Sequence, residues 1–319
     1  MSGKSSSRVL RRRHRPSFAS RQLGRSIIEV MIASTIGIVV MGTVLTLVGN
    51  ASRGTRTQDG QSKLTENAQV GLNVLASHVR QSGFSLPRLN TIPGRQFANY
   101  EGAAVRGCDS AFADPVEPDL ALTACVGNGT PNALAVAYEA DAFNTLLLAP
   151  GQPSDCLGRP LAAQVSAIDG ANFFVAENRF YLRNNATTGD PELVCDGNGG
   201  AGFGAAQPIV SNVEDFQVWF GVSDTTTTQF GNTVFSGVVA SYLTGDQLDA
   251  QFIAEPLLNR WSRVNSVRIC LLMRTDDFVA DEATPYVDCQ GNVIDPPDRR
   301  LRYAVSTTIN LRNNSALAE

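Results

Sequence analysis

Few side chains in this sequence could do covalent chemistry. The 319 residues include two histidines, His14 and His78, and His14 lies in a basic N-terminal segment. Neither a Ser-His-Asp arrangement nor a histidine-based zinc site can therefore be assembled in the body of the chain. Asp196 and Asn198 alternate as in a calcium loop, but no acid follows near the expected end of that loop. We expect no catalytic residues, no metal site and no cofactor, and we predict that the protein is not an enzyme.

The cysteines are the other reactive side chains. An even number of cysteines on the exported side of a membrane suggests disulfides. Six cysteines allow about 15 pairings, and the sequence does not choose among them. Pairing of nearest neighbours is our prediction because each pair flanks a turn-rich or Gly/Pro-rich loop, and the alternative is that some cysteines stay free and buried. The predicted pairs are Cys108 with Cys125, Cys156 with Cys195, and Cys270 with Cys289.

Glu29 is notable for its apolar surroundings. It is the only charged side chain in residues 27–48, IIEVMIASTIGIVVMGTVLTLV. This run is long enough to cross a bilayer, which takes roughly 20 residues. A charged side chain at the centre of a membrane helix costs about 2.5 to 3.5 kcal/mol. We therefore expect Glu29 to have a function and a specific partner.

The residues before this run add a second pattern. A basic leader precedes Gly24, and Glu29 follows Gly24 by five positions. This arrangement resembles the class III signal of type IV prepilins and pseudopilins, although that family usually has phenylalanine at the position of Arg25. The resemblance implies that prepilin peptidase cleaves between Gly24 and Arg25 and that the new amine at Arg25 is methylated. It also implies that Glu29 pairs with the N-terminal amine of a neighbouring subunit.

Two alternatives explain the N-terminal region differently. It could be an ordinary secretory signal, cleaved after Ala51, or an uncleaved anchor. The apolar region of a signal peptide is only about 7 to 15 residues long, and neither alternative explains Glu29. The positive-inside rule places the leader in the cytoplasm in every case.

The next segments predict a long helix. Leu64, Ala68, Leu72, Leu75 and Val79 recur at the spacing of one face of an amphipathic helix. We expect a leader over residues 1–24, a helix over 25–82 with a membrane span at 27–48, an irregular connection over 83–132 and a β-rich domain over 133–319. The predicted strands are 133–138, 145–148, 163–168, 173–176, 179–182, 213–222, 233–242, 264–273 and 301–311, and a second helix is predicted over 246–261.

Four blocks of sequence resemble one family of pilins. They are LTENAQVGLNVLASHVRQSGF at 64–84, VEDFQVWFGV at 213–222, VNSVRICLLMR at 264–274 and RRLRYAVSTTINLRN at 299–313. They look like the recognisable blocks of the PilW family of type IV minor pilins. The resemblance implies an α+β, pilin-like fold in which the long N-terminal helix packs on an antiparallel β-sheet body with irregular insertions.

The same resemblance implies a role and a location. The role is that of a minor pilin in priming and assembly of the type IV pilus, at or near the tip, with twitching motility as a consequence. The implied partners are prepilin peptidase, other minor pilins, the major pilin and the inner-membrane assembly platform, with a tip adhesin as a further candidate. The implied location is the bacterial inner membrane, with the body in the periplasm, and then the cell-surface pilus.

Other functions stay open. A J-type minor pseudopilin of a type II secretion system is similar to the same family, and a membrane-anchored periplasmic binding module would use the irregular middle of the chain as its ligand surface. Residues 90–205 carry no recognised motif, and we expect this protein's own specificity there. Outside its basic leader the chain is acidic, so we expect no direct binding of nucleic acid.

Overall fold

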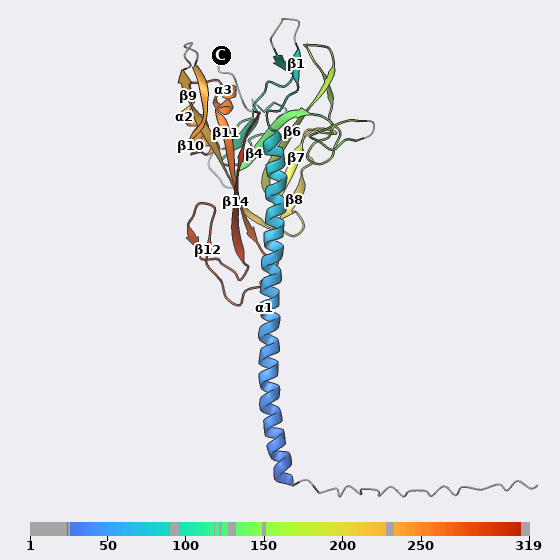
Figure 1. Ribbon diagram of the computed structural model, residues 1–319, viewed down its shortest axis with the longest axis vertical. Coiled ribbons are helices and arrows are strands. Elements are labelled where there is room, and N and C mark those ends of the chain that lie inside the picture. The colour runs from blue at the N-terminus through green and yellow to red at the C-terminus, as the bar shows by residue number, and fades with distance from the viewer. Residues whose placement is uncertain are drawn as a thin grey trace, which may run out of the picture. The chain divides into compact units, whose positions relative to one another are not determined.

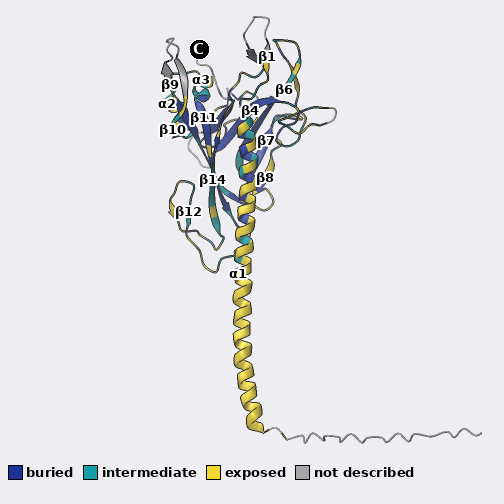
Figure 2. Ribbon diagram, in the orientation of Figure 1, coloured by how far each residue is buried: buried dark blue, intermediate teal, exposed yellow. Residues whose placement is uncertain are grey.

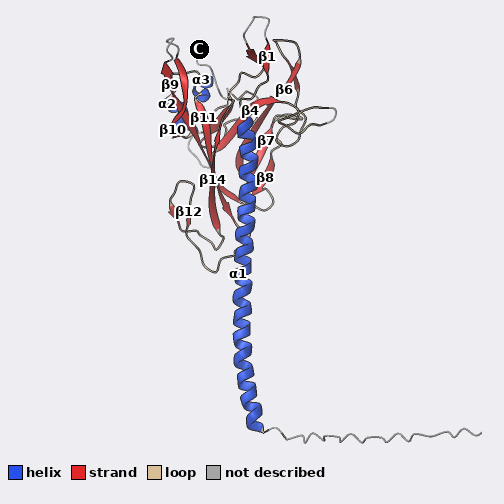
Figure 3. Ribbon diagram, in the orientation of Figure 1, coloured by secondary structure: helices blue, strands red, loops and turns tan. Residues whose placement is uncertain are grey.

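The computed structural model describes residues 24, 26–89, 96–117, 119–120, 123–126, 132–148, 151–227 and 233–313. The chain divides into two compact units, Met1–Gly54 and Thr55–Glu319, and the division falls within helix α1 (Ile27–Gln81). Figure 3 shows the helices and strands. In the described part of the chain, α1 is the one helix that is long and apolar enough to cross a membrane.

Two antiparallel sheets make up most of the second unit (Figure 1). In the six-stranded sheet, β5 (Ala163–Val165) pairs with β6, and the other strands follow the order β3 (Val105–Cys108), β4 (Ala133–Ala140), β6 (Asn172–Asn184), β7 (Pro191–Gly197) and β8 (Gln207–Ser211). The four-stranded sheet has the order β10 (Thr233–Leu243), β9 (Val213–Thr227), β11 (Val264–Arg274) and β14 (Arg302–Asn310). Two short hairpins pair β1 (Pro87–Leu89) with β2 (Gln96–Ala98) and β12 (Tyr286–Val287) with β13 (Val293–Ile294).

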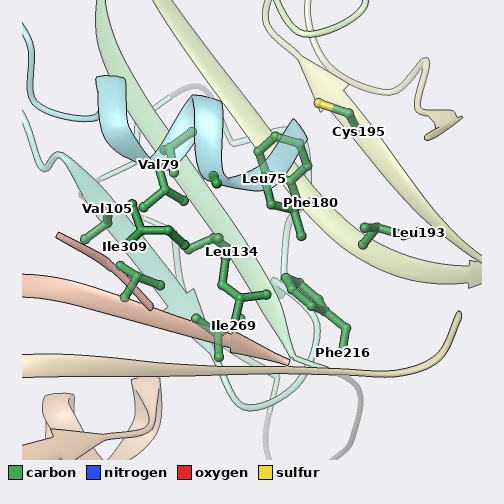
Figure 4. Close-up of a cluster of buried hydrophobic side chains, with 14 of the residues drawn as sticks. Leu75, Val79, Val105, Leu134, Phe180, Leu193, Cys195, Phe216, Ile269 and Ile309 are labelled. Atoms are coloured by element: carbon green, nitrogen blue, oxygen red, sulfur yellow. The ribbon is translucent and has the colours of Figure 1, made fainter. Parts of the chain in front are cut away.

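The predicted stripe of α1 packs into the main hydrophobic core. Leu64, Ala68, Leu75 and Val79 are buried in one cluster with residues of both sheets. Figure 4 shows Leu75 and Val79 with their neighbours Leu134, Phe180, Phe216 and Ile269. The predicted α+β fold, a long N-terminal helix on an antiparallel sheet body, is therefore confirmed.

Gly71 also belongs to this stripe and is buried, whereas the predicted Leu72 is only partly buried. A Cβ atom at Gly71 would lie 3.1 Å from Leu271 Cδ1 and 3.1 Å from Val210 Cγ2. The glycine thus lets the helix approach β8 and β11 closely, in spite of its lower helix propensity of about 1 kcal/mol relative to alanine.

The four-stranded sheet follows the period-2 pattern of its sequence. Ile269 of β11 lies opposite Val218 of β9 and Thr307 of β14. Val267, Ile269, Leu271 and Met273 are all buried on the core face, as the alternation predicted. The residues between them, including Arg268 and Cys270, lie on the outer face of the sheet.

The predicted helix over 246–261 is wrong as a single element. The structure has α2 (Gly245–Gln251) and α3 (Leu257–Ser262) in its place. Thr244 caps α2 in a capping box with Gln247. Pro256 separates the two helices because proline lacks an N–H and disfavours the helical conformation of the residue before it.

Several strand predictions also differ from the structure. Residues 145–148 form no strand, because Asn144 and Thr145 bond to Asp141 in a turn and only an isolated bridge follows at Leu148. The segments 173–176 and 179–182 belong to one strand, β6. Strands β7 and β8 were not predicted at all, and β3 lies inside the predicted irregular connection.

Candidate functional site

Glu29 lies in the first turn of α1. Its backbone N–H donates to the carbonyl of Ser26 at 3.0 Å, and its side chain is exposed. The carboxylate has no hydrogen-bond or ion-pair partner among the residues that the structure describes. An anion at this end of a helix is favoured by about 0.3 to 1 kcal/mol. Arg25 lies outside the described residues, so cleavage between Gly24 and Arg25 stays a prediction.

The apolar half of α1 is exposed on all sides of the helix. Every described residue of the first unit is exposed (Figure 2). The hydroxyls of Ser34, Thr35, Thr43 and Thr46 donate to carbonyls three residues earlier in the helix, at 2.7 to 2.9 Å. These bonds make the hydroxyls compatible with a bilayer or with packed helices. Within 27–48, Glu29 is therefore the one polar side chain whose bonding is not completed inside the helix.

The structure contains three disulfides in the second unit. They join Cys108 to Cys125, Cys156 to Cys195, and Cys270 to Cys289, with Cα–Cα distances of 5.5, 6.6 and 5.8 Å. These are the nearest neighbours along the chain, and no cysteine is free. The disulfides bind β3 to the loop that follows it, β7 to the loop before β5, and β11 to the loop that carries β12.

His78 joins α1 to the six-stranded sheet. Its Nδ1 atom lies 3.2 Å from the hydroxyl of Tyr138 and 3.4 Å from Nδ2 of Asn178. Burial lowers the pKa of His78 to about 4, against the opposing effect of the Asp155 carboxylate. His78 is therefore a neutral side chain held at the contact between α1 and the sheet.

The region of the partial calcium pattern is engaged in local contacts. Asp196 Oδ2 accepts from the Gly204 N–H at 2.7 Å, and Asp196 Oδ1 lies 3.6 Å from Nη2 of Arg159. Asn198 Oδ1 accepts from the Glu177 N–H at 3.0 Å. No group of three or more His, Cys, Asp or Glu side chains in the described ranges is placed to hold a metal ion.

A groove of about 870 Å³ lies on the outer face of the four-stranded sheet. The segment 285–291 forms its wall, and the Cys270–Cys289 disulfide fastens this wall to β11. Its lining includes four aromatic rings and two arginines: Trp219, Tyr242, Tyr286, Tyr303, Arg268 and Arg302. Sequence analysis predicted specificity in 90–205 and missed this groove. The outward-facing Trp219 and Arg268, between core residues of β9 and β11, are the signal that could have found it.

Comparison with known proteins supports the predicted family. Residues 179–313 match the family model of PilW, type IV pilus-assembly protein W. The resemblance is thus confirmed for the C-terminal part of the chain, including β9, β11 and β14. No curated protein matches the sequence. Among solved structures, a type IV-like pilin from Thermus thermophilus is similar, with 12% identity and a TM-score of 0.40 over 79% of this chain and 98% of that chain.

The described structure adds three features to this partial family match. The confirmed features are an apolar N-terminal helix that could anchor in a membrane, an antiparallel sheet body and disulfides. The match to a pilus-assembly family is limited to residues 179–313.

Proposed function

We propose that the protein is a minor pilin that prepilin peptidase processes and that takes part in priming and assembly of the type IV pilus, at or near the tip. The observation that carries the proposal is the Glu29 carboxylate, which has no partner among the described residues and lies at the start of the exposed apolar half of α1. It occurs in a chain whose residues 179–313 match PilW. A cation from another subunit would complete the bonding of this carboxylate.

The mechanism is structural. Cleavage after Gly24 would give Arg25 a free amine one helical turn before Glu29. Glu29 of one subunit would then bind the amine of its neighbour as their apolar helices pack, which offsets the cost of about 2.5 to 3.5 kcal/mol for a charge at the centre of an apolar layer. The β-rich body would contact other minor pilins, the major pilin and a tip adhesin. The protein would be made in the inner membrane, together with the assembly platform, before it enters the pilus.

The first experiment is the N-terminal mass of the protein recovered from membranes and from sheared surface filaments. A start at Arg25 in both fractions is the expected result. A start at Met1 would indicate an anchored binding module, and a start at Ser52 would indicate a conventional signal peptide. A secretion defect without a piliation defect on deletion would indicate the type II secretion pseudopilin.

The role of Glu29 is tested separately by Glu29→Ala. We expect this variant to be inserted and cleaved but absent from sheared filaments. Glu66→Ala is the matched control, because Glu66 is an exposed acid on the same helix beyond the apolar half. Assembly of Glu29→Ala at the level of Glu66→Ala would refute the pairing.

A further inference from the structure

We propose that the groove on the outer face of the four-stranded sheet binds an acidic polysaccharide. In this binding mode, a sugar ring lies on Trp219, and the carboxylate of a uronate residue binds Arg268, whose guanidinium stacks on Tyr242. The proposal concerns a ligand of the folded body and does not depend on cleavage, on Glu29 or on assembly into a filament.

The floor of the groove is built as an aromatic platform. Tyr242 of β10 lies opposite Gly221 of β9, and a Cβ atom at Gly221 would lie 3.1 Å from Cε1 of Tyr242. The glycine therefore leaves room for the tyrosine ring beside the sheet. The hydroxyl of Tyr242 accepts from Ser266 Oγ at 3.2 Å, which fixes the ring. Trp219 lies on the same face, opposite Arg268 in the register of β9 and β11.

Arg268 is the group of the lining that could bind an anionic ligand. The guanidinium of Arg268 lies 4.3 Å from the centre of the Tyr242 ring, its side chain is exposed, and it forms no ion pair within the described ranges. Of the other two charged residues in the lining, Arg302 is neutralised by carboxylates of the protein, and Asp288 is held in its own turn by hydrogen bonds. Arg302 pairs with Glu214 at 2.6 Å and with Asp298 at 2.7 Å. Asp288 accepts from the N–H groups of Gln290 and Asn292 in its own turn.

The shape and the mixed chemistry of the groove favour a saccharide over an apolar ligand. Its volume of about 870 Å³ falls within the range of about 300 to 1,000 Å³ for small-ligand sites. The lining contains hydroxyl and amide groups, such as Ser306 and Gln290, as well as aromatic rings. Sugars need both, because their C–H faces pack on aromatic rings while their hydroxyls form hydrogen bonds. A planar guanidinium in addition selects a carboxylate, with two parallel hydrogen bonds.

The groove also provides its own reporter. The chain has two tryptophans. Trp261 is fully buried, whereas Trp219 lines the groove. A ligand in the groove must therefore change the emission of Trp219 and leave that of Trp261 nearly constant.

The test is a titration of the full chain in detergent micelles with a galacturonate hexamer, followed by tryptophan emission and by calorimetry. Glucose hexamer is the neutral probe. We expect the galacturonate hexamer to bind at least 10-fold more tightly than the glucose hexamer, and we expect Arg268→Gln to weaken its binding about 10-fold or more. Trp219→Phe should remove the emission change and weaken the heat signal. Arg299→Gln is the matched control, because Arg299 is an exposed arginine near an aromatic ring, Phe278, outside the groove.

Three outcomes would overturn the proposal. The first is that neither sugar binds. The second is that binding persists unchanged in both Arg268→Gln and Trp219→Phe. The third is that the sugars leave the Trp219 emission of the wild-type chain unchanged, whereas addition of the Trp219→Phe variant changes that emission. The groove would then be an interface between two copies of the chain.

Discussion

His78 makes the contact between α1 and the six-stranded sheet sensitive to pH. It is packed against Tyr138, Asn178 and the ring of Phe180, whose centre lies 5.4 Å from that of the imidazole. Burial lowers its pKa to about 4, and the nearby Asp155 carboxylate only partly opposes this effect. We predict that protonation of this one side chain weakens the docking of the helix on the sheet.

The sign follows from where the proton binds. In the unfolded chain the pKa of a histidine is about 6.5. Between pH 6.5 and pH 4 the unfolded chain therefore binds a proton that the folded chain does not, so the free energy of unfolding falls as the pH falls. The stabilisation is fully present above pH 6.5. A pKa lowered from 6.5 to about 4 corresponds to a loss of about 3 kcal/mol by pH 4, at about 1.36 kcal/mol per pKa unit.

The assay compares the wild-type chain with His78→Gln, which cannot titrate but can still bond to the Tyr138 hydroxyl. Both proteins are unfolded by urea in detergent micelles from pH 4 to pH 7.5, with the disulfides intact, and tryptophan emission is recorded. Glu177 also titrates here, because burial raises its pKa to about 7 against the effect of Arg179. The stabilisation that Glu177 contributes is lost as the pH rises. It is the same in both proteins, so it cancels in the difference between their free energies of unfolding.

We expect the stability difference, wild type minus His78→Gln, to be constant above pH 7 and to fall by about 3 kcal/mol at pH 4. A difference that stays constant over the whole range would refute the reasoning, because His78 would then titrate equally in the folded and unfolded chains.

Three further predictions concern the body. Replacing Cys156 and Cys195 by serine opens the loop with the largest sequence separation, 39 residues, and should lower the unfolding free energy by about 4 kcal/mol; a loss below 1 kcal/mol in a urea titration would contradict this. Arg302→Gln removes a buried arginine from Glu214 and Asp298 and should cost about 1.5 to 3 kcal/mol, whereas Arg183→Gln, at a more exposed pair with Glu192, should cost less than about 1 kcal/mol; equal losses would show that burial is not decisive. Gly107→Ala places a methyl group 2.3 Å from Cζ of Phe220 and should cost about 1 to 3 kcal/mol in the same urea titration. Gly54→Ala is the control, because a Cβ atom there has nothing within 4 Å, and it should not destabilise the protein.

Much of the fold could be predicted from periodicity. The apolar run of α1, its buried stripe and the alternation in β11 and β14 each have a single dominant period, so local sequence indicated their type. Strand β7 lacked that signal and β6 was predicted only as two separate pieces, because both strands bury charged and polar side chains. Arg179 in β6 is fully buried and bonds to Glu177 at 2.6 Å, and Asp196 in β7 is buried beside Arg159. These charged residues can be buried because oppositely charged side chains pair with them in the folded protein. The sequence does not show which side chains form these pairs.

One candidate site could be predicted from the sequence and the other could not. Glu29 could be found from the sequence because its signal is local, a charge within an apolar run. The groove requires residues of β9, β10, β11 and β14 and a loop 285–291 to meet, so its lining is scattered over more than eighty positions of the sequence. What could not be predicted is the sheet order that places Trp219 beside Arg268 and brings Tyr242 next to both.

The order of the disulfides along the chain has a consequence for export. Each bond joins a cysteine to the next one in sequence, so the three closed loops follow one another without overlap. If the body crosses a membrane with its N-terminal side first, as the proposed function requires, Cys108 meets Cys125 before Cys156 has emerged, and each later cysteine meets its partner in the same order. The first pair available to an oxidant is then always the native pair. A chain with this sequential disulfide connectivity could form its native bonds during translocation without an isomerase.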